Sequence, residues 1–100
     1  MTVSDFAKYV VDNMHRATLA NALNIANKLD NPDYYSFTEF VKCLNDYITQ
    51  LATDNSIDAL KCSKILVASS DSLLAYNSSV KYNKMMIIDN YIIDLWRIFQ

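Results

Sequence analysis

Three side chains of this sequence are suited to nucleophilic catalysis or zinc binding: the single histidine His15 and the cysteines Cys43 and Cys62. A zinc site needs four nitrogen or sulfur ligands, typically at CxxC or HExxH spacing, and these dispersed residues supply three at most. A cysteine nucleophile needs a nearby base, which no spacing here indicates. We therefore expect a solvated His15 and two reduced, partly buried thiols, with one disulfide between them as the alternative.

The carboxylates are ten aspartates and one glutamate, Glu39. Helical bundles that bind two metal ions use several glutamates and Glu-x-x-His pairs that project into the core. The single such spacing in this sequence is that of Asp12, three residues before His15. We therefore expect no bound metal or cofactor, no catalytic residues, and a protein that is not an enzyme.

The 100 residues include no glycine. Walker loops, dinucleotide-binding fingerprints and the serine nucleophile elbow all need glycine for backbone reasons, so none of them is present. Glycine also supplies many tight turns and strand bends, and its absence favours an all-α fold.

The composition is that of one folded domain over residues 1–100, with 52% apolar and 20% charged residues. No apolar run has the length of a membrane span. Asp5 and Lys8 interrupt the segment where a signal peptide would have its apolar core, so we expect a cytoplasmic protein without membrane contact. A net charge of −2 argues against direct nucleic-acid binding.

The charge is unevenly distributed along the chain. Residues 30–58 hold six acids and one lysine, whereas residues 59–84 hold four lysines and one acid. Tyrosine rings supply contact area and acids steer encounters with a basic surface, so this acidic segment predicts a face that binds a basic protein. The predicted partner-binding residues are Asp30, Asp33, Tyr34, Tyr35, Asp46, Tyr47 and Asp54. Alternatively, the acids cap and solvate a helix while the tyrosines close the core.

The triplet Asp33, Tyr34 and Tyr35 resembles the docking element of colicin nuclease immunity proteins, which are small acidic helical bundles that block a basic toxin. The resemblance covers three residues, and the chain departs from that family in lacking glycine. The resemblance is one of design, and the acidic segment itself predicts a small inhibitor of the immunity or anti-defence type that occludes a toxin, a nuclease or a nucleic-acid-handling complex. On this hypothesis, replacing Tyr34 or Tyr35 with alanine weakens partner binding and leaves folding intact.

The first helix is expected to begin near Ser4, where Thr2 and Asp5 have the spacing of a capping box. Residues 3–14 and 19–29 carry apolar faces about a quarter turn apart. Because no glycine or proline interrupts them, we predict one long bent N-terminal helix; the alternative is a break between His15 and Thr18. Pro32 then predicts a turn over residues 30–33.

The second helix has the clearest start signal. Ser36 and Glu39 form a capping box, and Tyr35 and Phe40 have the spacing of a hydrophobic staple. An apolar stripe follows and ends near Thr53; its residues are Phe37, Phe40, Val41, Leu44, Ile48 and Leu51.

The third segment carries two apolar faces that lie nearly opposite each other. One face holds Cys62, Leu66, Leu73 and Tyr76, and the other holds Ile57, Leu60, Val67 and Leu74. A continuous helix would therefore have to be covered on two sides. The alternative is a break at residues 69–72, where serine and aspartate could cap a new helix.

The last segment, residues 80–99, is apolar except for a narrow stripe of Asn83, Asn90, Asp94 and Arg97. We predict a largely buried C-terminal helix, because a hairpin at Asp89 and Asn90 would lack glycine for its turn. The whole chain is then a compact bundle of four or five helices. A second functional hypothesis is an assembly subunit that forms a homodimer or larger oligomer through this helix, with Tyr82, Met86, Ile93 and Trp96 as contacts.

Overall fold

The computed structural model describes residues 1–30 and 34–100, without the side chains of Lys81 and Tyr82. Those residues form five helices and no strand, which confirms the predicted all-α bundle. The turn predicted at residues 30–33 involves Asn31, Pro32 and Asp33, which lie outside the described residues. The helices are α1 (Val3–Met14), α2 (Leu19–Ala26), α3 (Phe37–Thr53), α4 (Ala59–Asn77) and α5 (Lys81–Phe99).

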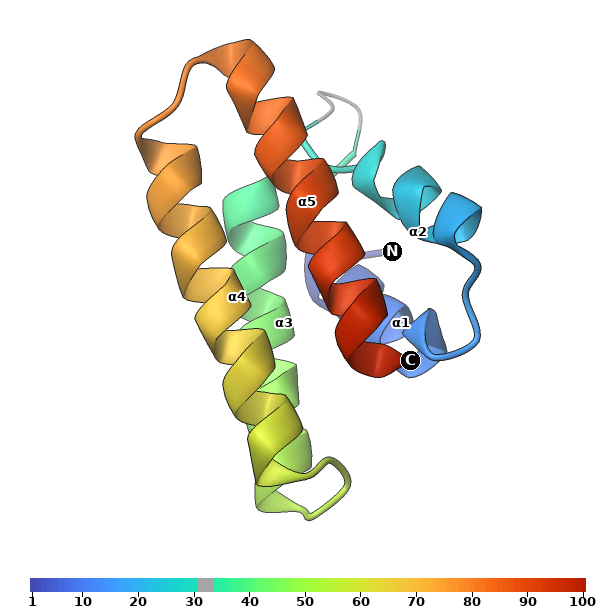
Figure 1. Ribbon diagram of the computed structural model, residues 1–100. Coiled ribbons are helices and arrows are strands. Elements are labelled where there is room, and N and C mark those ends of the chain that lie inside the picture. The colour runs from blue at the N-terminus through green and yellow to red at the C-terminus, as the bar shows by residue number, and fades with distance from the viewer. Residues whose placement is uncertain (31–33) are drawn as a thin grey trace.

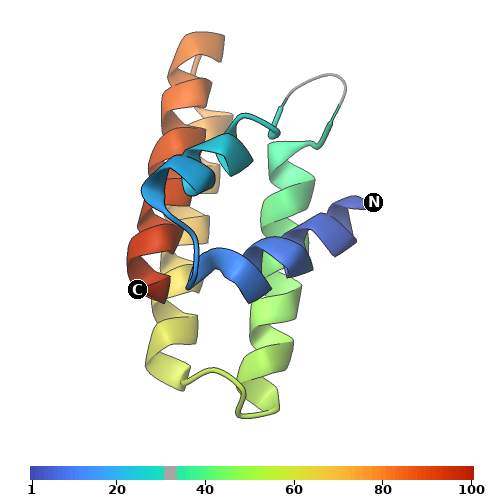
Figure 2. The ribbon, with the colours of Figure 1, turned by 90° about the vertical axis from the view of Figure 1, so that its right-hand side faces the viewer.

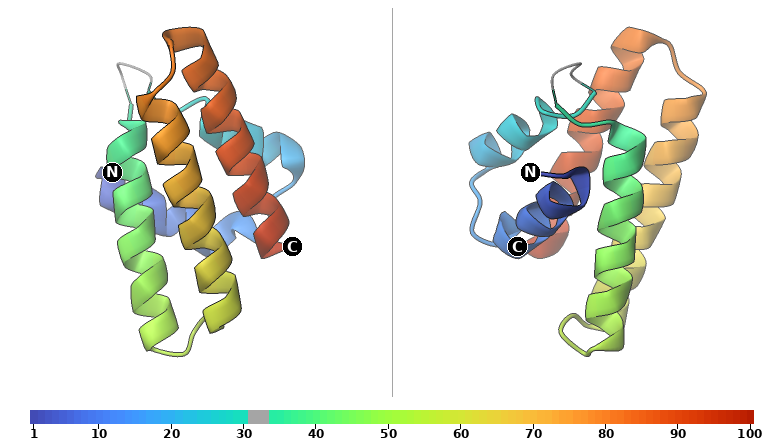
Figure 3. Two further views of the ribbon diagram at one scale, coloured as in Figure 1. Left: turned by 60° about the vertical axis from the view of Figure 1, so that its left-hand side comes forward. Right: turned by 180° about the vertical axis from the view of Figure 1, so that it is seen from behind.

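The three long helices form one layer, in which α4 lies between α3 and α5 and runs antiparallel to both (Figures 1 and 3). The two short helices cover one side of this layer. Figure 2 shows α1 crossing α3, while α2 packs along α5. The radius of gyration is 12.6 Å, close to the value of about 13 Å expected for a chain of this length.

Four of the helices, α1 to α4, begin at side-chain caps. Thr2 accepts the N–H of Asp5 at 3.1 Å to start α1, and Ser36 accepts the N–H of Glu39 at 3.4 Å to start α3. Asp58 caps α4 in the same way. These contacts satisfy backbone donors that have no partner inside the helix, and the predicted starts of α1 and α3 are confirmed.

The prediction of one long bent N-terminal helix is wrong, because α1 ends at Met14 and α2 begins at Leu19. Thr18 adopts an extended backbone and accepts the N–H of Asn21 at 3.1 Å, so α2 has a cap of its own. The carbonyl of Ala17 accepts the indole N–H of Trp96 at 2.8 Å. The break therefore needs neither glycine nor proline, since a threonine cap and a contact with α5 replace the helical hydrogen bonds.

The core lies between the layer and the two short helices. The predicted stripe of α3 forms its centre, with Phe37, Phe40, Leu44 and Ile48 fully buried. Helix α4 is continuous through residues 69–72, which excludes the break considered there. The apolar side of α4 that holds Leu60, Val67 and Leu74 is exposed among the described residues. The expectation that neighbouring elements bury both sides of this helix is therefore wrong for the isolated chain.

Helix α5 buries one side, which holds Ile88, Tyr91, Ile92 and Leu95. Met85 and Met86 are 66% and 62% exposed, so the prediction of a largely buried helix overstates its burial. The cause is its place at one edge of the layer, where its outer side meets solvent. The polar stripe predicted for this helix is exposed. Among the helices of residues 1–30 and 34–100, none combines the length and apolar character of a membrane span.

Candidate protein-binding surface

The residues predicted to bind a partner are spread along the whole of α3. Asp30, Tyr34 and Tyr35 precede its first turn, Asp46 and Tyr47 lie in its middle, and Asp54 follows its last residue. A helix of 17 residues is about 25 Å long, so the described members of the set do not form one compact patch. Asp33 lies outside the described residues.

Asp30 has an internal structural role. Its backbone has a positive φ of 56°, a conformation that aspartate tolerates better than most residues. One carboxylate oxygen accepts the N–H of Phe37 at 2.9 Å, and the other accepts the hydroxyl of Tyr76. Burial, together with this bond to Asp30, raises the pKa of Tyr76 to about 12. The carboxylate therefore ties the start of α3 to α4.

The adjacent tyrosines differ in their surroundings. Tyr35 is half-buried: its ring stacks on Phe6 with centroids 4.5 Å apart, and its hydroxyl donates to the carbonyl of Met1. Phe6 also contacts Phe40, so its ring links the two residues of the predicted hydrophobic staple. The side chain of Tyr34 is 57% exposed. Of this pair, Tyr34 is the ring available to a partner.

Tyr47 is held at the crossing of α1 and α3. Its hydroxyl donates to Asp12 at 2.7 Å, and the ammonium of Lys8 lies 5.9 Å from its ring centroid. The hydrogen bond to Asp12 raises the pKa of Tyr47, and burial and the negative charge of Asp12 add to the effect. Asp12 was absent from the predicted set, because it is 35 residues from Tyr47 in sequence and no local pattern links them.

The exposed charges of α1, of α3 and of its C-cap residue extend this region. They comprise five acids and two lysines, and we call them the acidic surface: Asp5, Asp12, Glu39, Asp46 and Asp54, with Lys8 and Lys42. Glu39 and Asp46 are seven residues apart and therefore share one side of α3. The acidic segment predicted from sequence thus gains two acids from α1.

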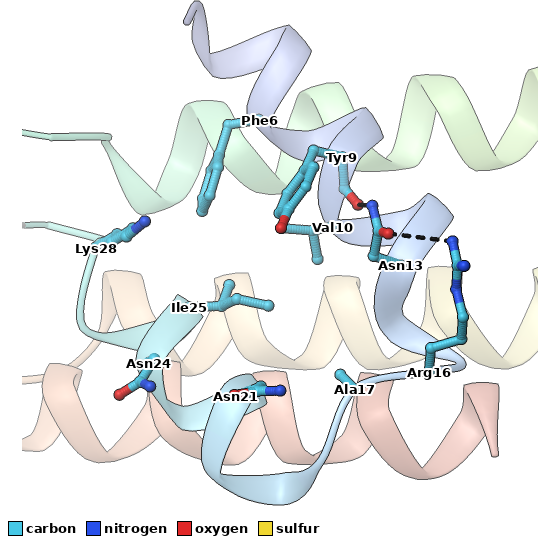
Figure 4. Close-up of a pocket in the computed structure, with 10 residues that line it drawn as sticks. All are labelled: Phe6, Tyr9, Val10, Asn13, Arg16, Ala17, Asn21, Asn24, Ile25 and Lys28. Atoms are coloured by element: carbon cyan, nitrogen blue, oxygen red, sulfur yellow. Dashed lines mark hydrogen bonds between the residues drawn. The ribbon is translucent and has the colours of Figure 1, made fainter.

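The break between α1 and α2 creates a cleft of about 430 Å³ (Figure 4). Arg16 and Lys28 lie at its opposite ends, and Asn13 both donates to the carbonyl of Tyr9 and accepts from Arg16. No acid is among the described residues that line it. Sequence reasoning missed this cleft because it depends on the helix break.

A second cleft, of about 480 Å³, lies beside His15. Asp12, Asp58 and Lys61 also line it, whereas Cys43 and Cys62 do not contribute among its described lining residues. Both cysteines are free thiols, as predicted; Cys62 is buried and Cys43 half-buried. Over residues 1–30 and 34–100, no three His, Cys, Asp or Glu side chains are grouped so that they could hold a metal ion.

The residues of α5 that were predicted to make contacts in self-association differ in their exposure. Met86 is exposed, but Ile93 and Trp96 are half-buried, and the indole of Trp96 is bound to Ala17. The side chain of Tyr82 is not described. Trp96 therefore joins α5 to the α1–α2 connection.

Comparisons of the chain with protein families, curated proteins and solved structures find no match. Its surfaces must therefore be interpreted from their own geometry.

A further exposed surface follows the outer side of α4. Leu60, Val67 and Leu74 are 66%, 58% and 73% exposed, and we call these three residues the α4 stripe. A groove of about 490 Å³ runs beside it, between α4 and α5. The signal was present in the sequence as the second apolar face of this helix, but only the structure shows that this face is uncovered.

Proposed function

We propose that this protein is a small, non-enzymatic inhibitor that occludes a basic surface of a partner protein with its acidic surface. The contact between Asp12 and Tyr47 supports the proposal most directly, because it places an aromatic ring and a carboxylate together where α1 crosses α3. Aromatic rings near the centre of an interface supply much of its binding energy.

The proposed mechanism is electrostatic attraction followed by steric cover. Five acids against two lysines attract a positively charged surface over about one Debye length and increase the association rate. Tyr47 and Tyr34 then supply contact area in the bound state. Because Asp12 already orients the phenol of Tyr47, little side-chain freedom remains to be lost on binding.

Capture from the cells that make the protein tests this proposal. The test variant carries Glu39→Lys and Asp46→Lys, two exposed positions on the acidic surface. The control variant carries Asp89→Lys and Asp94→Lys, which change the net charge equally on exposed positions of α5. Both variants should show the wild-type circular dichroism spectrum and unfolding midpoint.

We expect the wild type and the α5 control to recover the same basic protein in equal amounts, and the acidic-surface variant to lose it. Equal recovery by both variants, or recovery of an acidic protein by the wild type, would contradict the proposal. Captured material must also disappear at high salt, because the attraction is between exposed charges.

The second candidate function is that of an assembly subunit that associates with itself. The observation that favours it is the exposed α4 stripe. Because the indole of Trp96 is bound inside the chain to Ala17, we propose the contact on α4 and not on α5.

A further inference from the structure

The α4 stripe has the spacing of a helix-pairing surface. Its three residues are seven positions apart, so they form a line about 20 Å long on the side opposite the buried Cys62, Ile65 and Ser69. The helix is thus apolar on two sides, of which the fold covers one. Ser63, Lys64, Ser70 and Asp71 lie between the members of the stripe, so the stripe is a line of separate apolar side chains, and it is their seven-residue repeat that is typical of helix pairing.

We propose that the α4 stripe binds the α4 stripe of a second copy of this chain, with the two helices antiparallel. A two-fold axis perpendicular to α4 near Val67 places each Val67 beside its counterpart. The same rotation brings Leu60 of each copy level with Leu74 of the other. Every member of the stripe then has an apolar partner, as a closed symmetric interface requires.

The charges beside the stripe favour this direction of packing. Lys64 and Asp71 are also seven residues apart, and both line the groove along the same edge of the stripe. In the antiparallel arrangement, Lys64 of each copy lies near Asp71 of the other, which gives two attractive pairs. In a parallel two-fold arrangement, the edge that carries Lys64 and Asp71 would lie on opposite sides of the seam in the two copies, so these attractive pairs would not form.

The opposite edge of the stripe allows close approach. Ser63 and Ser70, three residues after Leu60 and Val67, flank the stripe there; both are exposed, and Ser63 also reaches the groove. Small side chains let two helices approach without steric conflict. Since one helix from each copy makes this contact, the interface is at the small end of the usual range, and we expect dimers that dissociate on dilution.

This inference deepens the second candidate function, self-association, and does not rest on the inhibitor proposal, whose acidic surface lies on α1 and α3. A variant that no longer self-associates should still capture the partner. A variant that no longer captures the partner should still self-associate. The two proposals can therefore fail separately.

Sedimentation equilibrium over a wide concentration range tests the contact. The wild type should pass from the chain mass of 11.5 kDa to twice that mass as its concentration rises. Val67→Lys should stay monomeric. Val80→Lys is the matched control, since Val80 is also a valine and is 56% exposed but lies outside the stripe, so it should dimerise like the wild type.

Charge exchange tests the antiparallel direction. Lys64→Asp alone and Asp71→Lys alone each bring like charges together and should each weaken the dimer, whereas the double variant restores opposite pairs and should recover it. A wild type that is monomeric throughout would overturn the inference, as would equal effects of Val67→Lys and Val80→Lys. Failure of the double variant to recover dimerisation would exclude the antiparallel contact. The circular dichroism of each variant should match the wild type.

Discussion

The hydroxyl groups of Ser69 and Tyr91 lie 2.7 Å apart in the core, where they join α4 to α5. Both side chains are fully buried. Burial raises the pKa of Tyr91 more than the hydrogen bond with Ser69 lowers it, so the phenol stays protonated. This polar pair therefore fixes the register of two helices inside an apolar core.

A double-mutant cycle on Ser69 and Tyr91 should show strong coupling. Ser69→Ala leaves a buried phenol without its partner and should lower the free energy of unfolding by about 1–3 kcal/mol. Tyr91→Phe should cost about 1 kcal/mol, because a helical serine can bond to a carbonyl of the preceding turn. The double variant should lose less than the sum of the two in urea unfolding. Additive losses would show that the hydroxyls do not interact.

Replacement of Asp30 should destabilise the start of α3. Asp30→Ala removes the acceptors of Phe37 and Tyr76 and places alanine at a positive φ, for a loss of about 2 kcal/mol. Asp30→Asn is the control, since asparagine tolerates this backbone and still offers an oxygen to Phe37. It should lose clearly less in the same urea titration, and equal losses would argue against the capping role.

Stability should decrease at alkaline pH partly because of Tyr76. Its pKa is about 12 in the fold against an ordinary 10.0, so above pH 10 the unfolded chain releases this proton first. The contribution of Tyr76 is therefore complete below pH 10 and is lost as the pH rises towards 12. Tyr76→Phe should be less stable at neutral pH but should show a shallower decline of melting temperature over that range. An unchanged decline would contradict the assignment.

Tyr34 and Tyr35 should respond differently to alanine. Tyr35→Ala removes the stack on Phe6 and should cost about 1–2 kcal/mol of folding stability. Tyr34→Ala, at an exposed position, should change stability by less than about 0.5 kcal/mol. It should still weaken partner binding by about 1 kcal/mol or more. Chemical unfolding and a binding titration on the same preparations separate these effects, and equal stability losses would contradict the assigned environments.

The helix starts could be predicted because their causes are local. Thr2 and Ser36 each lie three residues before the N–H that they accept, and the stripe of α3 repeats with the helical period. The break after Met14 could not be predicted with the same reasoning. Its local part is the cap that Thr18 gives to Asn21, which periodicity did not distinguish from a continuous helix. Its distant part is the bond between Trp96 and Ala17, which are 79 residues apart.

The candidate surfaces likewise combine features that are local in sequence with features that depend on distant contacts. The acidic segment was visible in the sequence, but the internal use of Asp30 depends on Tyr76, which is 46 residues away. Likewise, the second apolar face of α4 was visible, whereas its lack of cover follows from α1 and α2 both packing on one side of the layer. Periodicity identifies a face, and only the packing of the helices determines what covers it.

The most direct test of the central claim is a calorimetric titration of the captured partner against the wild type and against the Glu39→Lys, Asp46→Lys variant. We expect saturable binding with no chemical change in either protein, weakened by about tenfold or more in the variant. An unchanged affinity, or a partner that emerges chemically modified, would contradict the claim.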